Sequence, residues 1–286
     1  MFSLAVILAV LFGSAFLAGI LGSYLGIGGG ILLVPVMTLG LGIDIRVAVA
    51  TSIVGVIATS TGAASVYVRD HLTHLRLGMF LEVATTIGAI AGAFLAILLP
   101  NRAVLFVLFG LVMLYATSYM ARPVSSRRES DSAPRSRLAE RLKLGDRYRE
   151  PSDGRVHEYA VARPGWGFGL GALAGAVSGL LGVGGGFIQV PLMNVVMRVP
   201  TKPAVATSNF MIGVTAAASA FIYYSGGFLD PSLAGVLVVG VFLGTRLGTR
   251  FMVRARPGRI RIAFAILLAA IGVLMVLKAF IPGMAL

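Results

Sequence analysis

Residues 26–37 read GIGGGILLVPVM, and residues 182–193 read GVGGGFIQVPLM. The two stretches align without a gap at a spacing of 156 residues. The same spacing places the segment AVATS at 48–52 onto AVATS at 204–208. Two separate motifs that repeat at one spacing indicate an internal duplication, because chance similarity would not preserve the distance between them.

The duplication divides the chain into three parts. We predict two homologous membrane halves, residues 1–121 and 165–286, joined by a charged linker over residues 122–164. The chain is 57% hydrophobic and 12% charged, with a mean hydropathy of +0.93. A soluble globular domain has about 25% charged residues, so this composition excludes one, and it equally excludes disorder. The protein is therefore expected to be an integral membrane protein.

Apolar runs set the expected helices, since about 20 residues are needed to span a hydrocarbon core of about 30 Å. Eight such runs occur, near residues 2–25, 45–68, 77–99, 102–121, 165–182, 203–224, 231–250 and 260–281. Two shorter apolar stretches, 31–41 and 187–199, follow the glycine clusters and predict broken or half helices. The expected fold is all-α, with eight long and two short segments. The first run lacks the basic start of a signal peptide and is expected to remain as a spanning helix.

The formal charge of +13 would suggest nucleic-acid binding in a soluble protein. Here the linker holds 11 of the 24 Lys and Arg and 7 of the 11 Asp and Glu. Most remaining charges lie between apolar runs, so the pattern indicates membrane topology and no nucleic-acid partner is expected. The chain has no Cys, which excludes disulfides and thiolate metal sites.

The Lys and Arg bias predicts the orientation in a bacterial-type inner membrane. A cytoplasmic linker leaves 21 of the 24 Lys and Arg inside and only Arg46, Arg102 and Lys278 outside, with both termini outside. The gap at 69–76 is then inside, whereas its repeat partner at 225–230 is outside. The halves are therefore expected to be inverted, with each short segment either completing a crossing or folding back. Inverted repeats with interrupted helices are typical of secondary transporters.

The glycine clusters are the first candidate binding elements. They comprise Gly26, Gly28, Gly29 and Gly30 before Pro35, and Gly182, Gly184, Gly185 and Gly186 before Pro191. Such runs break a helix and leave free N–H groups at the start of the next one, where the helix dipole favours an anion. In hydrocarbon, those groups must line a cavity or meet a ligand. The alternative is that the glycines only allow close helix packing.

The repeated Ala-Val-Ala-Thr-Ser motif supplies uncharged hydrogen-bond donors at the start of a helix. Its candidate substrate-binding residues are Thr51, Ser52, Thr207, Ser208 and the adjoining Asn209. Several such donors suit an oxyanion, although hydroxyls also bond back to their own helix. Gln189 lies between the second glycine cluster and its proline, opposite Leu33 of the first half, and is the one strongly polar residue of its segment.

Glu82 is the only carboxylate within a predicted span, which indicates a proton carrier or an Arg partner. Glu82 also lies only six residues from Arg76, at the expected inner boundary of the membrane, so the alternative is that its carboxylate reaches the membrane–water interface. Further candidates for coupling or gating are Arg46, Lys202 and Arg246. His71 and His74 beside Asp70 form only a weak metal pattern, so neither a metal site nor a cofactor is expected.

No nucleophile elbow, HExxH motif or Walker motif occurs, so the protein is not expected to be an enzyme. The linker includes RLAERLKLGDRYRE at 137–150, which would form either a short basic helix on the inner leaflet or part of a solvated connector.

Two copies of G-x-G-G-G-x4-P, each followed by A-x-A-T-S, resemble the sulfite exporter TauE/SafE family, also called the toluene sulfonate uptake permease family. The resemblance covers roughly residues 5–120 and 165–280; the linker lies outside it and is long beside the plainest family pattern. It implies an inner-membrane permease for sulfite, organosulfonates or related sulfur-containing anions, commonly outward and coupled to an ion gradient.

We therefore expect a transporter that opens a midplane anion site to each side in turn. Expected partners are the lipid bilayer, a small anion of the sulfite or sulfonate class and a coupling ion, H⁺ or Na⁺. A homodimer would form through the Gly88/Gly92 or Gly244/Gly248 faces. The alternatives are a channel or exporter for another small solute such as an amine or cation, and a membrane sensor or scaffold that uses the linker.

Overall fold

A computed structural model of the protein describes residues 4–99, 101–121, 136–150, 154–254 and 259–281. Within these ranges eight helices are long and apolar enough to cross a membrane. They are α1 (Leu4–Leu25), α3 (Ile45–Arg69), α4 (Leu75–Leu98), α5 (Arg102–Ala121), α7 (Pro164–Leu181), α9 (Thr201–Ser225), α10 (Pro231–Arg254) and α11 (Arg259–Phe280). Their bounds lie within a few residues of the eight apolar runs, so the predicted all-α integral membrane fold is confirmed.

Two short helical segments follow the glycine clusters, as the sequence predicts. Helix α2 (Gly30–Pro35) continues as the π-helix η1 (Val36–Gly40), and α8 (Gly186–Pro191) continues as η2 (Leu192–Val196). The change of helix type occurs at the proline in both halves, because proline has no N–H to donate. Wider turns follow, in which Leu41 N donates to Val36 O at 3.2 Å.

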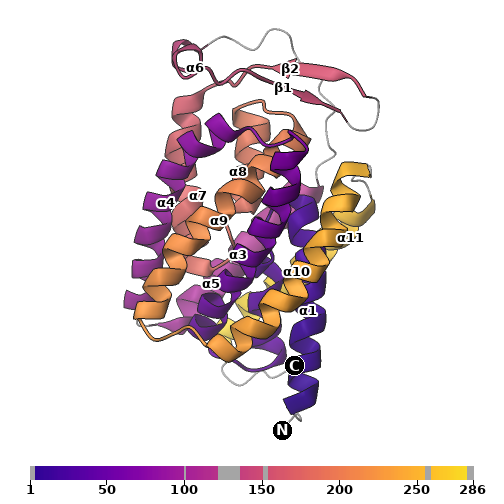
Figure 1. The fold of residues 1–286 in the computed structure, drawn as a ribbon. Coiled ribbons are helices and arrows are strands. Elements are labelled where there is room, and N and C mark those ends of the chain that lie inside the picture. Colours follow the sequence, from indigo (N-terminus) through magenta and orange to yellow (C-terminus); the bar gives the residue numbers. More distant parts are fainter. Residues whose placement is uncertain (1–3, 100, 122–135, 151–153, 255–258, 282–286) are drawn as a thin grey trace.

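Each short segment folds back beside the helix before it and does not complete a crossing. The Met197 carbonyl, after η2, accepts from Ala162 N at 2.9 Å, just before α7 begins. In the first half, Lys278 Nζ near the end of α11 donates to the Thr38 carbonyl in η1 at 3.0 Å. Helix α1 begins and α11 ends at that same end of the molecule (Figure 1). Of the two arrangements that the sequence allows, the structure therefore has the re-entrant one.

Glycine contacts define how neighbouring helices run. A Cβ at Gly88 would lie 2.0 Å from Ala172 O, and one at Gly92 would lie 1.9 Å from Ala176 O, so α4 and α7 run in the same direction. Helices α1 and α10 pack in the same way, through Gly244 and Gly248. These four glycines are thus buried inside one chain. The predicted homodimer contact through them is wrong, because no surface remains there for a second copy.

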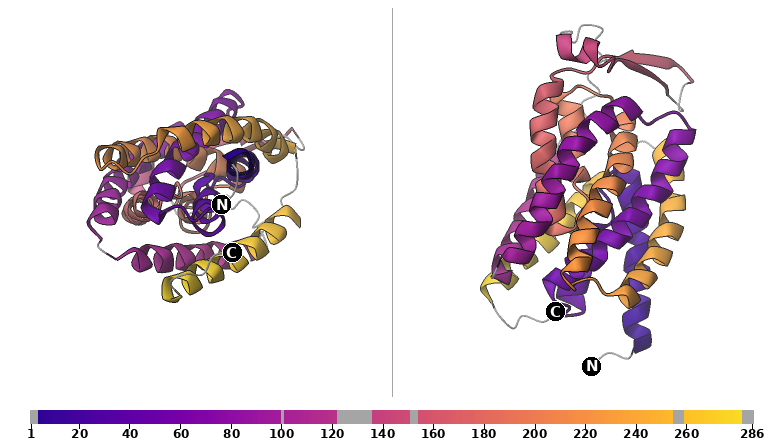
Figure 2. Two further views of the ribbon diagram at one scale, coloured as in Figure 1. Left: turned by 90° about the horizontal axis from the view of Figure 1, so that it is seen from below. Right: turned by 60° about the vertical axis from the view of Figure 1, so that its left-hand side comes forward.

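Helices α3 and α9 pack together at the centre in opposite directions. Gly55 lies against Leu237 and Gly62 against Thr245, which shows that α3 and α10 run in the same direction. Because α10 follows α9 through a short turn, α9 must oppose α3. Helices α5 and α11 form a second opposed pair along one face of the bundle (Figure 2).

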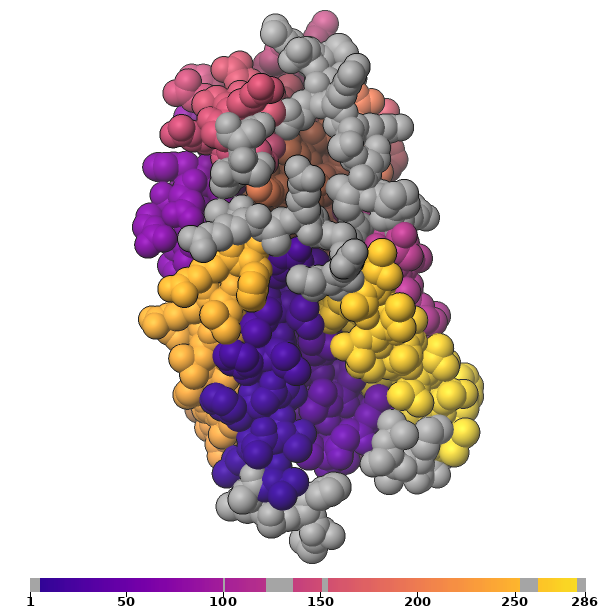
Figure 3. All heavy atoms as spheres, turned by 90° about the vertical axis from the view of Figure 1, so that its right-hand side faces the viewer, coloured from indigo at the N-terminus to yellow at the C-terminus, as the bar shows by residue number. Residues whose placement is uncertain are grey.

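The outer surface of the bundle is apolar. On α4, Met79, Val83, Ile87 and Leu98 are all more than half exposed and lie on one helical face. Helix α1 runs along the surface between α10 and α11 (Figure 3) and exposes apolar side chains such as Phe12 and Leu17. Exposing such large apolar faces to water is unfavourable, so these faces suit the hydrocarbon core of a membrane.

The described part of the linker forms a cap over the end of the bundle opposite the start of α1 (Figure 1). The cap consists of α6 (Arg137–Arg141) and an antiparallel pair, β1 (Asp146–Arg149) and β2 (Val156–Tyr159). Its apolar residues Ala139, Leu144 and Val161 are buried in one cluster with residues of α4, η2 and α9. The cap therefore differs from both expectations for 137–150, since only the first five residues are helical and the segment docks on the bundle.

Candidate functional site

The two glycine clusters touch each other at the centre of the bundle. A Cβ at Gly30 would lie 2.1 Å from the Gly182 carbonyl oxygen, and one at Gly186 would lie 2.0 Å from the Gly26 carbonyl oxygen. Real Cβ atoms do not approach this closely, so only glycine fits at either position. The repeated sequence thus forms a single structural site to which both halves contribute.

The serines of the repeated Thr-Ser pairs reach across to the opposite half. Ser52 Oγ donates to Gly182 O at 3.1 Å, and Ser208 Oγ donates to Gly26 O at 2.9 Å. Ser208 Oγ also lies 3.2 Å from Gln189 Oε1. The structure therefore brings together the glycine clusters, both serines and Gln189.

Several buried polar groups at this site lack a partner. The described residues offer no acceptor to the backbone N–H groups of 28–31 or 184–187, which begin α2 and α8. Thr51 Oγ1, Gln189 Nε2 and Asn209 Oδ1 are likewise buried without a hydrogen bond. A buried polar group without a partner costs about 1–3 kcal/mol. Most of these unused groups are donors, and each buried group of this kind calls for an explanation.

The candidate site is closed to both sides of the molecule. Thr51, Ser52, Thr207, Ser208 and Asn209 are all fully buried, and Gln189 is 1% exposed. Bundle packing surrounds the site on every side, so a solute reaches it only if helices move apart.

The predicted basic residues do not lie at this site: Arg46 and Lys202 are in the first turns of α3 and α9, and Arg246 is within α10. Arg46 donates to the Leu99 carbonyl and lies 5.7 Å from the Phe228 ring centroid. Lys202 pairs with Glu150 of the cap, and Arg246 lies 5.0 Å from the Phe242 ring centroid. None of these side chains contacts the glycine clusters in the described part of the chain. The donors at the centre are therefore neutral, as expected for the Thr-Ser and glycine elements.

Glu82 lies on α4, away from the glycine clusters. Its Oε1 accepts from Thr215 Oγ1 of α9 at 2.7 Å and from Thr86 Oγ1 at 2.9 Å. No Arg or Lys pairs with it in the part of the chain that the structure describes, and its proton-carrier and interfacial interpretations both stay predictions.

His74 connects the cap to the bundle. The sequence pattern does not predict this structural role. His74 caps the start of α4 by accepting from Leu77 N at Nδ1, while Nε2 lies 2.9 Å from the Leu144 carbonyl of the cap. Its backbone N–H donates to Thr207 Oγ1 at 2.9 Å, so the same residue touches the candidate site. His71, by contrast, is exposed and turns away at a φ of 54°.

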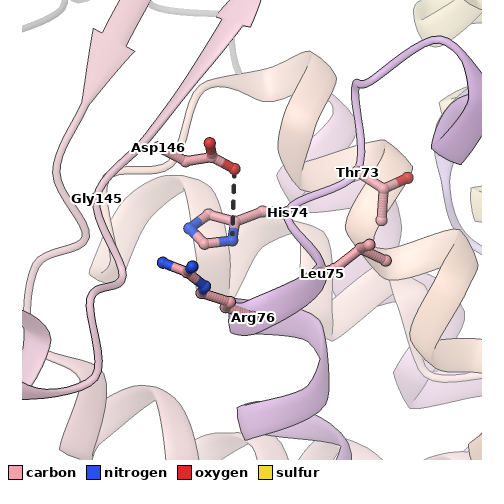
Figure 4. A pocket seen from close by; sticks show the side chains of 6 residues that line it. All are labelled: Thr73, His74, Leu75, Arg76, Gly145 and Asp146. Carbon is pink, nitrogen blue, oxygen red and sulfur yellow. Dashed lines mark ion pairs between the residues drawn. The ribbon is translucent and has the colours of Figure 1, made fainter.

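A cavity of about 310 Å³ lies between the start of α4 and the cap. It is lined by Thr73, His74, Leu75, Arg76, Gly145 and Asp146 (Figure 4). Asp146 Oδ2 lies 3.6 Å from His74 Nδ1. The docking of the cap on the bundle has one signal in the sequence. Residues 139, 144 and 161 are apolar, although the linker around them is rich in charged residues.

Comparison with known proteins agrees with these features. The model of the family described as "Sulfite exporter TauE/SafE" matches residues 11–275. The chain is 27% identical over 279 residues to the probable membrane transporter protein YunE of Bacillus subtilis, covering 93% of this chain and 95% of that protein. It is 24% identical over 290 residues to the probable membrane transporter protein MJ0441 of Methanocaldococcus jannaschii, covering 96% and 98%.

No solved structure matches the chain. The family match nevertheless covers both membrane halves and both glycine clusters. With its eight apolar helices, its duplicated G-x-G-G-G-x4-P motif and transporter relatives matched along nearly their full length, the chain belongs to the sulfite exporter TauE/SafE family of membrane transporters.

Proposed function

We propose that the protein is a secondary transporter that moves sulfite, an organosulfonate or a related sulfur-containing anion by alternating access, driven by an ion gradient. The observation that carries this proposal is the pair of touching glycine clusters, whose backbone N–H groups and Gln189 Nε2 lack acceptors in a buried site. An oxyanion accepts several such donors at once. Hydrocarbon lipid has no acceptor to offer them.

The two halves are inverted repeats in this proposal. Helix α9, the equivalent of α3, opposes it, and the serine contacts to the glycine carbonyls are exchanged between halves. A pseudo-twofold axis in the membrane plane accounts for both facts, and inverted halves support two equivalent states open to opposite sides. The closed site then corresponds to the intermediate between them. The linker lies on the cytoplasmic side of the inner membrane, with both termini outside.

The test is binding to the purified protein in detergent. We expect sulfite, thiosulfate, taurine or sulfoacetate to raise the melting temperature, whereas chloride and acetate at equal ionic strength do not. A ligand at 100 times its Kd adds about 2.7 kcal/mol to the free energy of unfolding. The Gln189→Leu variant is expected to bind roughly 10- to 100-fold more weakly, since one hydrogen bond to a charged group contributes about 1.5–3 kcal/mol.

Asn194→Leu is the matched control, because Asn194 is another amide of the same short segment and bonds only to Thr201 among the described residues. It should retain wild-type affinity. Stabilisation by amines or metal cations and by no sulfur anion would replace the proposal with a cation exporter. Stabilisation by none of these solutes would favour the sensor or scaffold alternative.

A further inference from the structure

The Glu82 carboxylate has one satisfied oxygen and one unsatisfied oxygen. Oε1 accepts from Thr215 Oγ1 at 2.7 Å and from Thr86 Oγ1 at 2.9 Å, and Thr85 Oγ1 lies 3.2 Å from Thr215 Oγ1. Oε2 is buried and has no hydrogen-bond partner. A carboxylate within a membrane span is costly unless it is paired or neutralised, so Oε2 requires a cationic partner.

A proton fits Oε2 better than a metal cation does. Metal cations of the hard class need several oxygen ligands at once. Here the hydroxyls of Thr86 and Thr215 are directed at Oε1. The surrounding helices are regular, so their carbonyls are committed to backbone hydrogen bonds. A proton requires only one oxygen, and it removes the buried charge when it binds.

Among the described residues, no other ionisable side chain is placed to neutralise Glu82. Helix α7 contains none, and η2 contains none. On α9, Lys202 lies at the first turn and pairs with Glu150, while Tyr223 and Tyr224 lie at the last turn. Arg76, in the first turn of α4, is exposed, and the cap's Asp146 faces His74.

We propose that Glu82 is the site where the transporter takes up and releases its coupling proton. The inference rests on the proposed transport function and assigns its coupling ion. The position equivalent to Glu82 in the second half is Val238, so this carboxylate exists once per chain and would carry one proton per transport cycle.

The structure also links the proton site to the anion site. Helix α9 carries Ser208 and Asn209 at the glycine clusters and Thr215 at Glu82, two helical turns further along. Gly78 of α4 lies against Thr207 and Phe210 of α9. Protonation changes Oε2 from an acceptor to a donor at the contact between α4 and α9. The packing of these two helices can therefore respond to the proton while α9 holds the anion.

The first experiment is infrared difference spectroscopy of the protein in lipid during a pH titration. We expect a protonated carboxyl band that appears on acidification, is lost in Glu82→Gln and persists in Glu158→Gln, an exposed carboxylate of the cap. Thr86→Val should move the midpoint of this band to higher pH, because it removes a donor to the ionised form. A spectrum with no band that depends on Glu82 would overturn the proposal.

The second experiment measures flux in liposomes of sulfoacetate and thiosulfate, which carry no titrating proton near neutral pH. A pH gradient should drive accumulation by the wild type and by Glu158→Gln and should not drive it in Glu82→Gln. Equal accumulation by Glu82→Gln would refute the coupling role. If the wild type neither binds nor moves any anion, the proposed function fails, and the infrared titration still decides whether Glu82 takes up the proton.

Discussion

Residues 30 and 186 must be glycine because of a tertiary contact between the two halves. Each lies against a carbonyl oxygen of the opposite half, at a distance that no Cβ tolerates. The spacing of the motif predicts a broken helix, and the close contact between the halves bears out the packing interpretation of these two glycines. Their anion-binding role stays a prediction. The N–H groups at the starts of α2 and α8 have no acceptor among the described residues, because the first N–H groups of a helix have no partner within it.

Gly30→Ala is expected to destabilise the protein by about 1–3 kcal/mol, because a methyl group would have to displace the Gly182 backbone. The melting temperature in detergent measures this change. The control is Gly235→Ala, since nothing lies within 4 Å of a Cβ there. Alanine also forms helices better than glycine, so the control should be neutral or stabilised by up to about 1 kcal/mol. Equal melting temperatures for both variants would contradict the close contact.

Hydroxyl and amide side chains at the site show where prediction from sequence stops. The repeat singles out Ser52 and Ser208, and both contact the glycine clusters. The sequence treats Thr51 and Thr207 as equivalent, yet only Thr207 accepts the His74 N–H, while Thr51 Oγ1 has no partner. That difference depends on the turn between α3 and α4 reaching α9, which no local pattern encodes.

At the scale of elements, the cap is the feature that sequence periodicity describes least well. A charged stretch with scattered leucines is compatible with a surface helix, and α6 is indeed helical. The strands form because Leu144, Tyr148 and Val161 are buried against the bundle. The strand propensity of each residue taken alone does not include such a tertiary contact.

Leu144→Asp should undock the cap, since Leu144 is 1% exposed and its cluster includes residues of α4 and η2. Amide hydrogen exchange in β1 and β2 is expected to accelerate at least tenfold, because burying a carboxylate costs several kcal/mol. Leu142→Asp makes the same chemical change at a position that is 38% exposed and should leave exchange unchanged. Equal exchange in both variants would show that the cap is not held by this cluster.

At the scale of the whole molecule, the proposed inversion predicts opposite locations for equivalent residues. Arg69 ends α3 and Ser225 ends α9, at positions related by the 156-residue repeat, and both are exposed. The chain has no Cys, so single-cysteine variants can be labelled without background. In intact cells, an impermeant maleimide should label Ser225→Cys and should not label Arg69→Cys.

The reference for the cytoplasmic side is Arg147→Cys on the exposed face of β1. It should behave like Arg69→Cys and react only after the membrane is permeabilised. Labelling of both Arg69→Cys and Ser225→Cys from the same side would mean that the halves are parallel. The inverted symmetry on which the alternating-access proposal rests would then be absent.

Sequence by itself determined the membrane class, the eight spans, the two short segments and the duplication. These properties follow from composition, run length and repetition along the chain, because water and hydrocarbon act on each segment separately. Tertiary structure alone decided that the short segments fold back, that the glycine clusters touch and that the cap docks through His74. Those features depend on which surfaces meet across more than a hundred residues, and local pattern does not specify such pairings.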